Sequence, residues 1–192
     1  MKSSYESFDK KPIFKRILKE IAVWAVEIVI VIGIAFLTIH FGVEKVTVVG
    51  KSMENALMPA DTIIVNKLAY KITKPKRYDV IVFDQSGKEH SYYNIKRVIG
   101  LPGETVQIKN GLVYIDGKKL KEEVKVKSIK DGGIADDKIT LDEDEFFVLG
   151  DNRNNSEDSR YANIGNVISD EIVGKAILRV NKFSIISQLN KK

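Results

Sequence analysis

The sequence predicts a mainly β protein, in which an antiparallel β-sheet domain follows one N-terminal transmembrane helix. One long apolar run stands near the N-terminus. After it come short runs rich in Val, Ile, Tyr and Phe, separated by Pro, Gly, Asp and Lys, which is the pattern of β-strands. The chain has 192 residues, enough for one globular domain beside the helix.

The apolar run covers Ile21–Val43 and is interrupted only by Glu27, Thr38 and His40. A helix over Ile21–Phe41 would be about 30 Å long, enough to cross a bilayer. The run is too long for the apolar part of a cleaved signal sequence, and no small-residue cleavage site follows it. A carboxylate at the bilayer centre costs about 2.5–3.5 kcal/mol, but Glu27 lies only two turns into the run. We interpret the run as an uncleaved anchor; the alternative is a buried helix of a soluble protein.

Residues 1–20 carry six basic side chains against three acidic ones. This asymmetry predicts a cytoplasmic tail, a single span over residues 21–43 and an extracytoplasmic domain over residues 44–192. That domain has a net charge of only +3, too mild to indicate a nucleic-acid partner. The absence of Cys excludes thiol catalysis and zinc–thiolate sites, and it is compatible with a bacterial envelope protein.

Eight runs after the anchor are predicted to form strands. Asn110-Gly111 lies between two of them and is a strong hairpin signal, because a type I′ turn needs positive φ at both central residues. Residues 118–139 are charged and contain glycine, so we expect an exposed surface excursion. The predicted strands are Lys45–Val49, Thr62–Asn66, Asp79–Phe83, Tyr92–Ile99, Glu104–Lys109, Leu112–Ile115, Glu145–Leu149 and Glu171–Val180.

A candidate nucleophile, Ser52, follows the anchor within ten residues. Gly50 permits close backbone approach, and Met53 and Leu57 are apolar residues in a segment that otherwise reads as a polar loop. Position 54 is Glu, so the stretch is not the Gly-x-Ser-x-Gly turn of α/β-hydrolases. The chain has no Cys and only two His, so Lys is almost the only residue type left to activate a serine.

The candidate base is Lys96, which lies inside the apolar run Tyr92–Ile99. A lysine in such a strand either faces solvent or is buried. Burial among apolar groups disfavours the ammonium and can lower its pKa by as much as about 3–5 units. A neutral amine near Ser52 could take the hydroxyl proton, which is the Ser-Lys variant of triad chemistry. The histidines, His40 in the apolar run and His90 in a polar stretch, offer no strong Ser-His-Asp candidate.

The stretch Gly150–Arg160 places two acidic and two basic residues close together: Asp151, Arg153, Asp158 and Arg160. It reads either as a polar turn with Asx caps or as a buried ion-pair network.

These three motifs, Val49–Met53, Ile95–Gly103 and Gly150–Arg160, resemble in order those of the type I (leader) signal peptidases. The resemblance covers nearly everything from Ile21 to about Val180. It implies roles for nine residues: Ser52 as nucleophile, Lys96 as general base, Gly50 at the oxyanion site, Ser156 orienting the amine, Asp158 and Arg160 as structural supports, and Met53, Leu57 and Ile95 lining the substrate cleft.

The chain departs from the family pattern at three places. Many relatives have a serine at the position of Gly50, whose hydroxyl helps to hold the oxyanion; here backbone N–H groups, chiefly that of Ser52, would serve. Proline and then Thr-Leu usually follow the Ser-Met pair, whereas this chain reads Glu54-Asn55-Ala56-Leu57. In the box Arg77–Phe83, to which we assign a packing role, Tyr78 stands where Gly is common.

The resemblance implies a membrane-bound serine endopeptidase of the bacterial cell membrane that removes signal peptides from preproteins through an acyl-enzyme. Its partners would be signal peptides with small residues at −1 and −3, and the lipid bilayer; no metal, organic cofactor or nucleic acid is implied. Two alternatives stay open. A self-cleaving repressor-type protease uses the same chemistry, but the predicted span argues against it. The other alternative is a membrane-tethered binding domain that has kept these motifs but does not catalyse cleavage.

Overall fold

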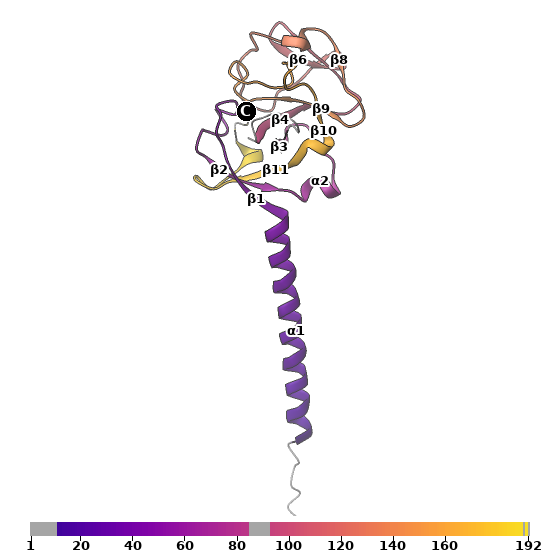
Figure 1. The fold of residues 1–192 in the computed structure, drawn as a ribbon, viewed down its shortest axis with the longest axis vertical. Coiled ribbons are helices and arrows are strands. Elements are labelled where there is room, and N and C mark those ends of the chain that lie inside the picture. Colours follow the sequence, from indigo (N-terminus) through magenta and orange to yellow (C-terminus); the bar gives the residue numbers. More distant parts are fainter. Residues whose placement is uncertain (1–10, 85–92, 190, 192) are drawn as a thin grey trace, which may run out of the picture. The chain divides into compact units, whose positions relative to one another are not determined.

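The structure, a computed structural model, describes residues 11–84, 93–189 and 191, except for the side chains of residues 11–14 and 37–40. It divides into two compact units between Gly42 and Val43. The first unit contains one helix, and the second contains all the described strands (Figure 1).

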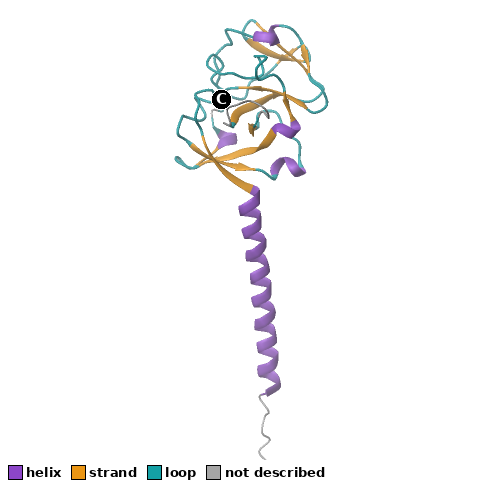
Figure 2. Ribbon diagram, viewed as in Figure 1, coloured by secondary structure: helices purple, strands orange, loops and turns teal. Residues whose placement is uncertain are grey.

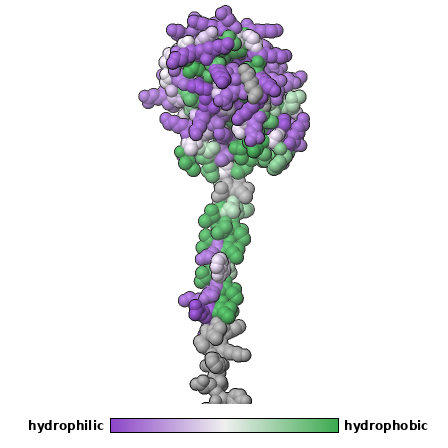
Figure 3. Space-filling model, turned by 180° about the vertical axis from the view of Figure 1, so that it is seen from behind, coloured by the Kyte–Doolittle hydropathy of each residue, from purple (hydrophilic) through white to green (hydrophobic). Residues whose placement is uncertain are grey.

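Helix α1 (Lys11–Gly42) forms the described part of the first unit. Its large apolar side chains are exposed, among them Trp24 (66%), Val29 (68%) and Phe36 (64%), and Figure 3 shows the apolar surface along the helix. Within the residues that the structure describes, no helix is both long enough and apolar enough to cross a membrane.

The second unit contains a large antiparallel sheet in the order β1-β2-β11-β3-β4-β9-β10, with β12 paired to β11 (Figure 2). The predicted mainly β, antiparallel fold is therefore confirmed. The predicted strands that fall in this sheet are found with their ends moved by no more than two residues. The strands are β1 (Val43–Thr47), β2 (Thr62–Asn66), β3 (Val80–Phe83), β4 (Asn94–Gly100), β9 (Glu145–Leu149), β10 (Val167–Ile168), β11 (Ile172–Arg179) and β12 (Ser184–Ile185).

The smaller sheet has the order β7-β6-β5-β8 and contains the predicted hairpin. Asn110 and Gly111 have φ values of 51° and 75°, as the type I′ turn requires. The bounds are β5 (Thr105–Lys109), β6 (Leu112–Ile115), β7 (Lys118–Lys119) and β8 (Ile139–Thr140). Short helices complete the domain: α2 (Ala69–Ile72) and the 3₁₀ helices η1 (Gly133–Asp136), η2 (Ser169–Glu171) and η3 (Ile186–Gln188).

The central strands of the large sheet are buried on both faces. In β3, Val80 and Val82 pack into one apolar cluster, whereas Ile81 and Phe83 pack into another. The alternation follows from the period-2 geometry of a strand. Strand β4 lies between β3 and β9, so any polar side chain that it carries is held in a rigid, largely water-free setting.

The expectation that residues 118–139 form an exposed excursion is wrong in part. Val124, Ile129 and Ala135 are buried, with exposures of 2%, 6% and 0%. Gly133 adopts φ 56°, and a Cβ there would lie 2.2 Å from the carbonyl oxygen of Arg160, so the segment packs tightly against that residue. Its lysines are exposed, whereas Ile129 and Ala135 join the apolar cluster that also contains Val106 and Phe147, which we call the second core. Charge counting alone does not reveal this.

Candidate active site

Ser52 lies in the loop that joins β1 to β2, residues 48–61, which we call the Ser52 loop. Two tight turns fold the loop on itself: Glu54 N donates to Lys51 O (3.1 Å), and Leu57 N donates to Met53 O (2.8 Å). Met53 and Leu57 are buried in the apolar cluster under the loop. These two side chains anchor the loop, while Ser52 stays partly exposed at its surface.

Lys96 comes from the middle of β4 and is only 5% exposed. Its Nζ lies 2.9 Å from Ser52 Oγ. Burial lowers the pKa of the Lys96 ammonium to about 8, against the opposing attraction of the Asp158 and Glu157 carboxylates. The Asp158 carboxylate is itself bonded to Arg160. The site thus combines a hydroxyl with an amine whose pKa of about 8 leaves a minor fraction neutral at pH 7.

The charged residues of Gly150–Arg160, which we call the 150–160 loop, are buried and paired. Asp158 holds Arg160 through bonds of 2.7 and 2.9 Å. Asp151 holds Arg97 of β4 through bonds of 2.7 and 2.6 Å. The prediction of a buried ion-pair network is therefore confirmed. Arg97, the partner of Asp151, was not predicted as a member of this network, although it directly follows Lys96 in the sequence.

Arg153 also pairs outside the loop, with Glu122 at 2.6 Å. Nothing in the sequence marks Glu122 as a partner, because it lies in the segment that reads as a surface excursion. The two residues bind the 118–139 segment to the 150–160 loop.

The Ser52 loop and the 150–160 loop touch directly. A Cβ on Gly150 would lie 2.5 Å from Ser52 O and 2.3 Å from Ser156 Oγ, so only glycine fits between them. Asn152 N donates to Ser52 O at 2.9 Å. Sequence reasoning did not single out Asn152, and its amide carries no signal that would have found it.

Ser156 lines the same cavity as Ser52 and Lys96. Its Oγ is buried and has no hydrogen-bond partner among the residues that the structure describes. The bond to the Lys96 amine that the resemblance implies is therefore not formed here, although the hydroxyl is available for it.

Two cavities meet at Gly50, Ser52 and Lys96. One, of about 220 Å³, is walled by apolar side chains that include Met53 and Ile95. The other, of about 710 Å³, is lined mostly by polar residues, and residues 154–157 of the 150–160 loop form part of its wall. The other residues that wall the apolar cavity are Val48, Val49, Tyr93 and Asn94.

The remaining candidates are placed as follows. Leu57 is fully buried in the core and does not line either cavity. Tyr78 has φ 71°, a conformation that favours glycine, and its hydroxyl donates to Lys121 O at 2.8 Å. Its ring packs against the second core, which accounts for a tyrosine at this position. His90 and the side chain of His40 lie outside the described residues.

Comparison with known proteins gives one consistent family. The family model described as "Signal peptidase, peptidase S26" matches residues 21–181. Signal peptidase I P of Bacillus subtilis subsp. natto is 36% identical over 174 residues, covering 87% of this chain and 91% of its own length. Signal peptidase I of Leptolyngbya laminosa is 40% identical over 145 residues, covering 72% of this chain and 69% of its own length.

A crystal structure of a signal peptidase I from Enterococcus faecalis V583 also matches, with 32% identity and a TM-score of 0.41. The match covers 54% of this chain and 97% of that chain. From the family match and the curated relatives, the chain belongs to the signal peptidase family, peptidase S26, and is a signal peptidase I, a serine protease that acts on signal peptides.

Proposed function

We propose that the chain cleaves signal peptides with Ser52 as nucleophile and Lys96 as general base, and that it does so as a membrane-anchored enzyme. The 2.9 Å contact between Lys96 Nζ and Ser52 Oγ carries this proposal. Lysine is inert as a base while it is protonated, and burial lowers the pKa of this amine to about 8, so that a usable fraction is neutral near physiological pH.

The reaction would proceed in two steps. The neutral Lys96 amine takes the Ser52 proton as Oγ attacks the scissile carbonyl, and the resulting ammonium returns a proton to the leaving amine. This leaves the signal peptide as an acyl ester on Ser52. A water molecule, activated by the same amine, then hydrolyses the ester and restores Ser52.

The oxyanion would be held by the backbone N–H of Ser52. Within the described residues this N–H donates no hydrogen bond. The nearest neighbour of a Cβ built on Gly50 would be Ser52 N, at 4.0 Å, so Gly50 leaves this donor uncovered. A free backbone donor beside the nucleophile is the usual element of an oxyanion hole.

Substrate selection would depend on the apolar cavity. Its volume of about 220 Å³ suits small side chains, in keeping with small residues at −1 and −3 of the signal peptide. Met53 and Ile95 would contact those residues, and the polar cavity would receive the chain beyond the scissile bond. Asp158 and Arg160 would brace the site without contacting substrate.

Ser156 would act on the amine rather than on the substrate. Its buried Oγ has no partner among the described residues and lines the cavity that contains Lys96, so we expect it to bond to the amine during the reaction. We expect Ser156→Ala to slow cleavage about tenfold, the usual effect of losing one orienting hydrogen bond, without abolishing it.

Residues 21–43 would anchor the enzyme, with residues 1–20 in the cytoplasm and residues 44–192 outside. The described apolar side chains of α1 are exposed, and a helix that is apolar all round is stable only when something apolar surrounds it. The apolar run also continues through residues 37–40, whose side chains lie outside the described residues. Protease added to intact protoplasts should digest the β domain; complete protection until lysis would refute this orientation.

The catalytic proposal is tested with purified protein in detergent and a preprotein substrate. Wild type should release the mature protein, with a new N-terminus directly after a small residue, and Ser52→Ala should release no more than a trace. A variant with both His40 and His90 replaced by Ala should keep most of the activity. Substantial cleavage by folded Ser52→Ala would refute the nucleophile, and no cleavage by wild type would favour a binding domain without activity.

A further inference from the structure

The Ser52 loop adopts a conformation that its own sequence does not enforce. Asn55 has φ 100°, outside the regions that non-glycine residues readily occupy. In the family pattern a proline stands at this position, and a proline ring would fix φ near −65°. Backbone of this kind persists only where its surroundings hold it, so some contact must keep the loop in place.

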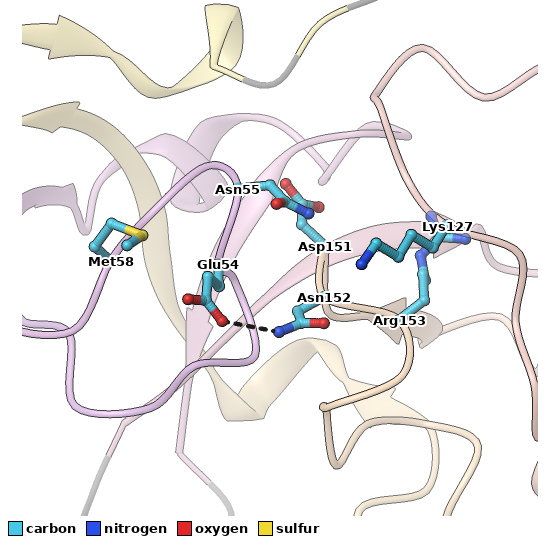
Figure 4. A pocket seen from close by; sticks show the side chains of 7 residues that line it. All are labelled: Glu54, Asn55, Met58, Lys127, Asp151, Asn152 and Arg153. Carbon is cyan, nitrogen blue, oxygen red and sulfur yellow. Dashed lines mark hydrogen bonds between the residues drawn. The ribbon is translucent and has the colours of Figure 1, made fainter.

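Besides the buried side chains of Met53 and Leu57, one such contact joins Glu54 and Asn152, which face each other in Figure 4 at the wall of a cavity of about 430 Å³. Asn152 Nδ2 donates to Glu54 Oε2 at 3.1 Å and to Lys51 O at 3.3 Å. The backbone N–H of Asn152 donates to Ser52 O at 2.9 Å. One residue of the 150–160 loop thus bonds to three residues of the Ser52 loop, Lys51, Ser52 and Glu54.

These bonds close a ring through the catalytic pair. Lys96 is joined by the chain to Arg97, which is fixed by two bonds to Asp151. Asp151 is joined by the chain to Asn152, which holds Ser52 O. The remaining side of the ring is the 2.9 Å contact from Lys96 Nζ to Ser52 Oγ. If the Asn152 side of the ring loosens, the distance between nucleophile and base is no longer fixed.

We propose that Glu54 is a positioning residue, whose carboxylate orients the Asn152 amide and thereby keeps Ser52 Oγ within reach of Lys96 Nζ. The proposal rests on the proposed function of Ser52 and Lys96. A carboxylate is a strong acceptor, and bonds to ionised groups are about twice as strong as neutral ones. The bond between Glu54 and Asn152 thus helps to hold a loop conformation that a proline at position 55 could not adopt.

The first test compares Glu54→Ala with Glu54→Gln in the full chain, using a peptide substrate. Glu54→Ala should lower kcat about tenfold, with KM and the acidic limb of the pH profile unchanged, because neither the substrate cavity nor the burial of Lys96 is altered. Glu54→Gln keeps an acceptor oxygen and should stay within about threefold of wild type. Glu143→Ala, the loss of an exposed acid elsewhere, is the matched control and should have no effect.

Double variants test the bond itself. Asn152→Ala should resemble Glu54→Ala, and the two together should lower kcat about tenfold and not about a hundredfold, because both remove one shared interaction. Combining Asn152→Asp with Glu54→Gln exchanges donor and acceptor, so it should recover part of the kcat that Asn152→Asp alone loses.

Hydrogen exchange tests the tether without catalysis. In Glu54→Ala the Asn152 amide should exchange at least fivefold faster than in wild type, while amides in β9 should be unchanged. If wild type cleaves nothing, the proposed function fails and this measurement still tests the tether. Wild-type kcat in Glu54→Ala, additive losses in the double variant, or unchanged Asn152 exchange would each overturn the proposal.

Discussion

Strand β4 carries one buried basic residue on each face, and the two residues have different partners. Lys96 and Arg97 are neighbours, with exposures of 5% and 2%, and successive residues of a strand point to opposite faces. Arg97 meets a carboxylate there, bonding to Asp151 at 2.7 and 2.6 Å. Lys96 meets the Ser52 hydroxyl at 2.9 Å. Burial is the same on both faces, and the partner differs.

The comparison shows that the same burial has different consequences for the two cations. A buried ion without a counter-charge is costly, so it gives up its charge when its chemistry allows, whereas a paired ion keeps it. Lysine can release its proton, and its pKa falls to about 8 here, while arginine stays charged in any protein environment. One face therefore supplies a base, and the other fixes the strand to the 150–160 loop.

The largest expected effect comes from placing an arginine on the Lys96 face. Lys96→Arg keeps a cation and its donors but removes the ability to lose a proton, so we expect kcat/KM to fall at least about a thousandfold. Activity should be assayed beside thermal unfolding, with Lys96→Met as the variant that tests folding without the charge. An active Lys96→Arg protein would mean that the amine does not act as the base.

On the Arg97 face, Asp151→Ala leaves a guanidinium buried without its carboxylate. We expect the free energy of unfolding to fall by about 3–5 kcal/mol, the usual effect of breaking a buried pair. The control is Glu44→Ala, which removes a more exposed pair with Lys67 and should change stability by no more than about 1 kcal/mol. Equal losses in urea unfolding would show that burial does not distinguish the two pairs.

The sequence pattern was sufficient to predict most strands of the large sheet, but it did not predict the pairing of Arg97 with Asp151. Strands such as β2 and β6 were predicted with correct bounds, because apolar runs and turn residues are local signals. The two-residue strands β8 and β10 pair with β5 and β9, from which long connections separate them, and they were not predicted. For the same reason the site was predicted as residues and not as contacts: Arg97 and Asp151 are 54 positions apart, and no local spacing joins them.

The Lys96 face should also affect stability in a pH-dependent way. Between about pH 8 and 10.5 the unfolded chain holds a proton on Lys96 that the native state has released, so native stability rises with pH through this window. Below pH 8 the full penalty applies, on the order of 3 kcal/mol. Lys96→Met should be more stable than wild type by about that amount at pH 7, and the difference should vanish toward pH 10.5.

Urea unfolding at several pH values measures this difference, and Lys51→Met, which removes an exposed lysine, is its control. A difference between wild type and Lys96→Met that stays constant from pH 7 to 10.5 would show that the lysine is protonated in the native state.

A smaller effect is expected beside the Lys96 face, at Gly50. A Cβ there meets nothing closer than Ser52 N at 4.0 Å, so a serine fits and its hydroxyl would stand near the proposed oxyanion donor. Gly50→Ser should raise kcat about tenfold with little change in KM, whereas Gly50→Ala, which adds the Cβ alone, should not. A gain shared equally by both variants would locate the effect in the backbone instead.

The central claim, that Lys96 is discharged by burial and serves as the base, is tested most directly by the pH dependence of kcat/KM on a peptide substrate. Only the neutral amine accepts the Ser52 proton, so the rate should rise with pH and level off above an apparent pKa close to 8. An acidic limb near 10.4, the value of a free lysine, would show that the amine is solvated and would contradict the account.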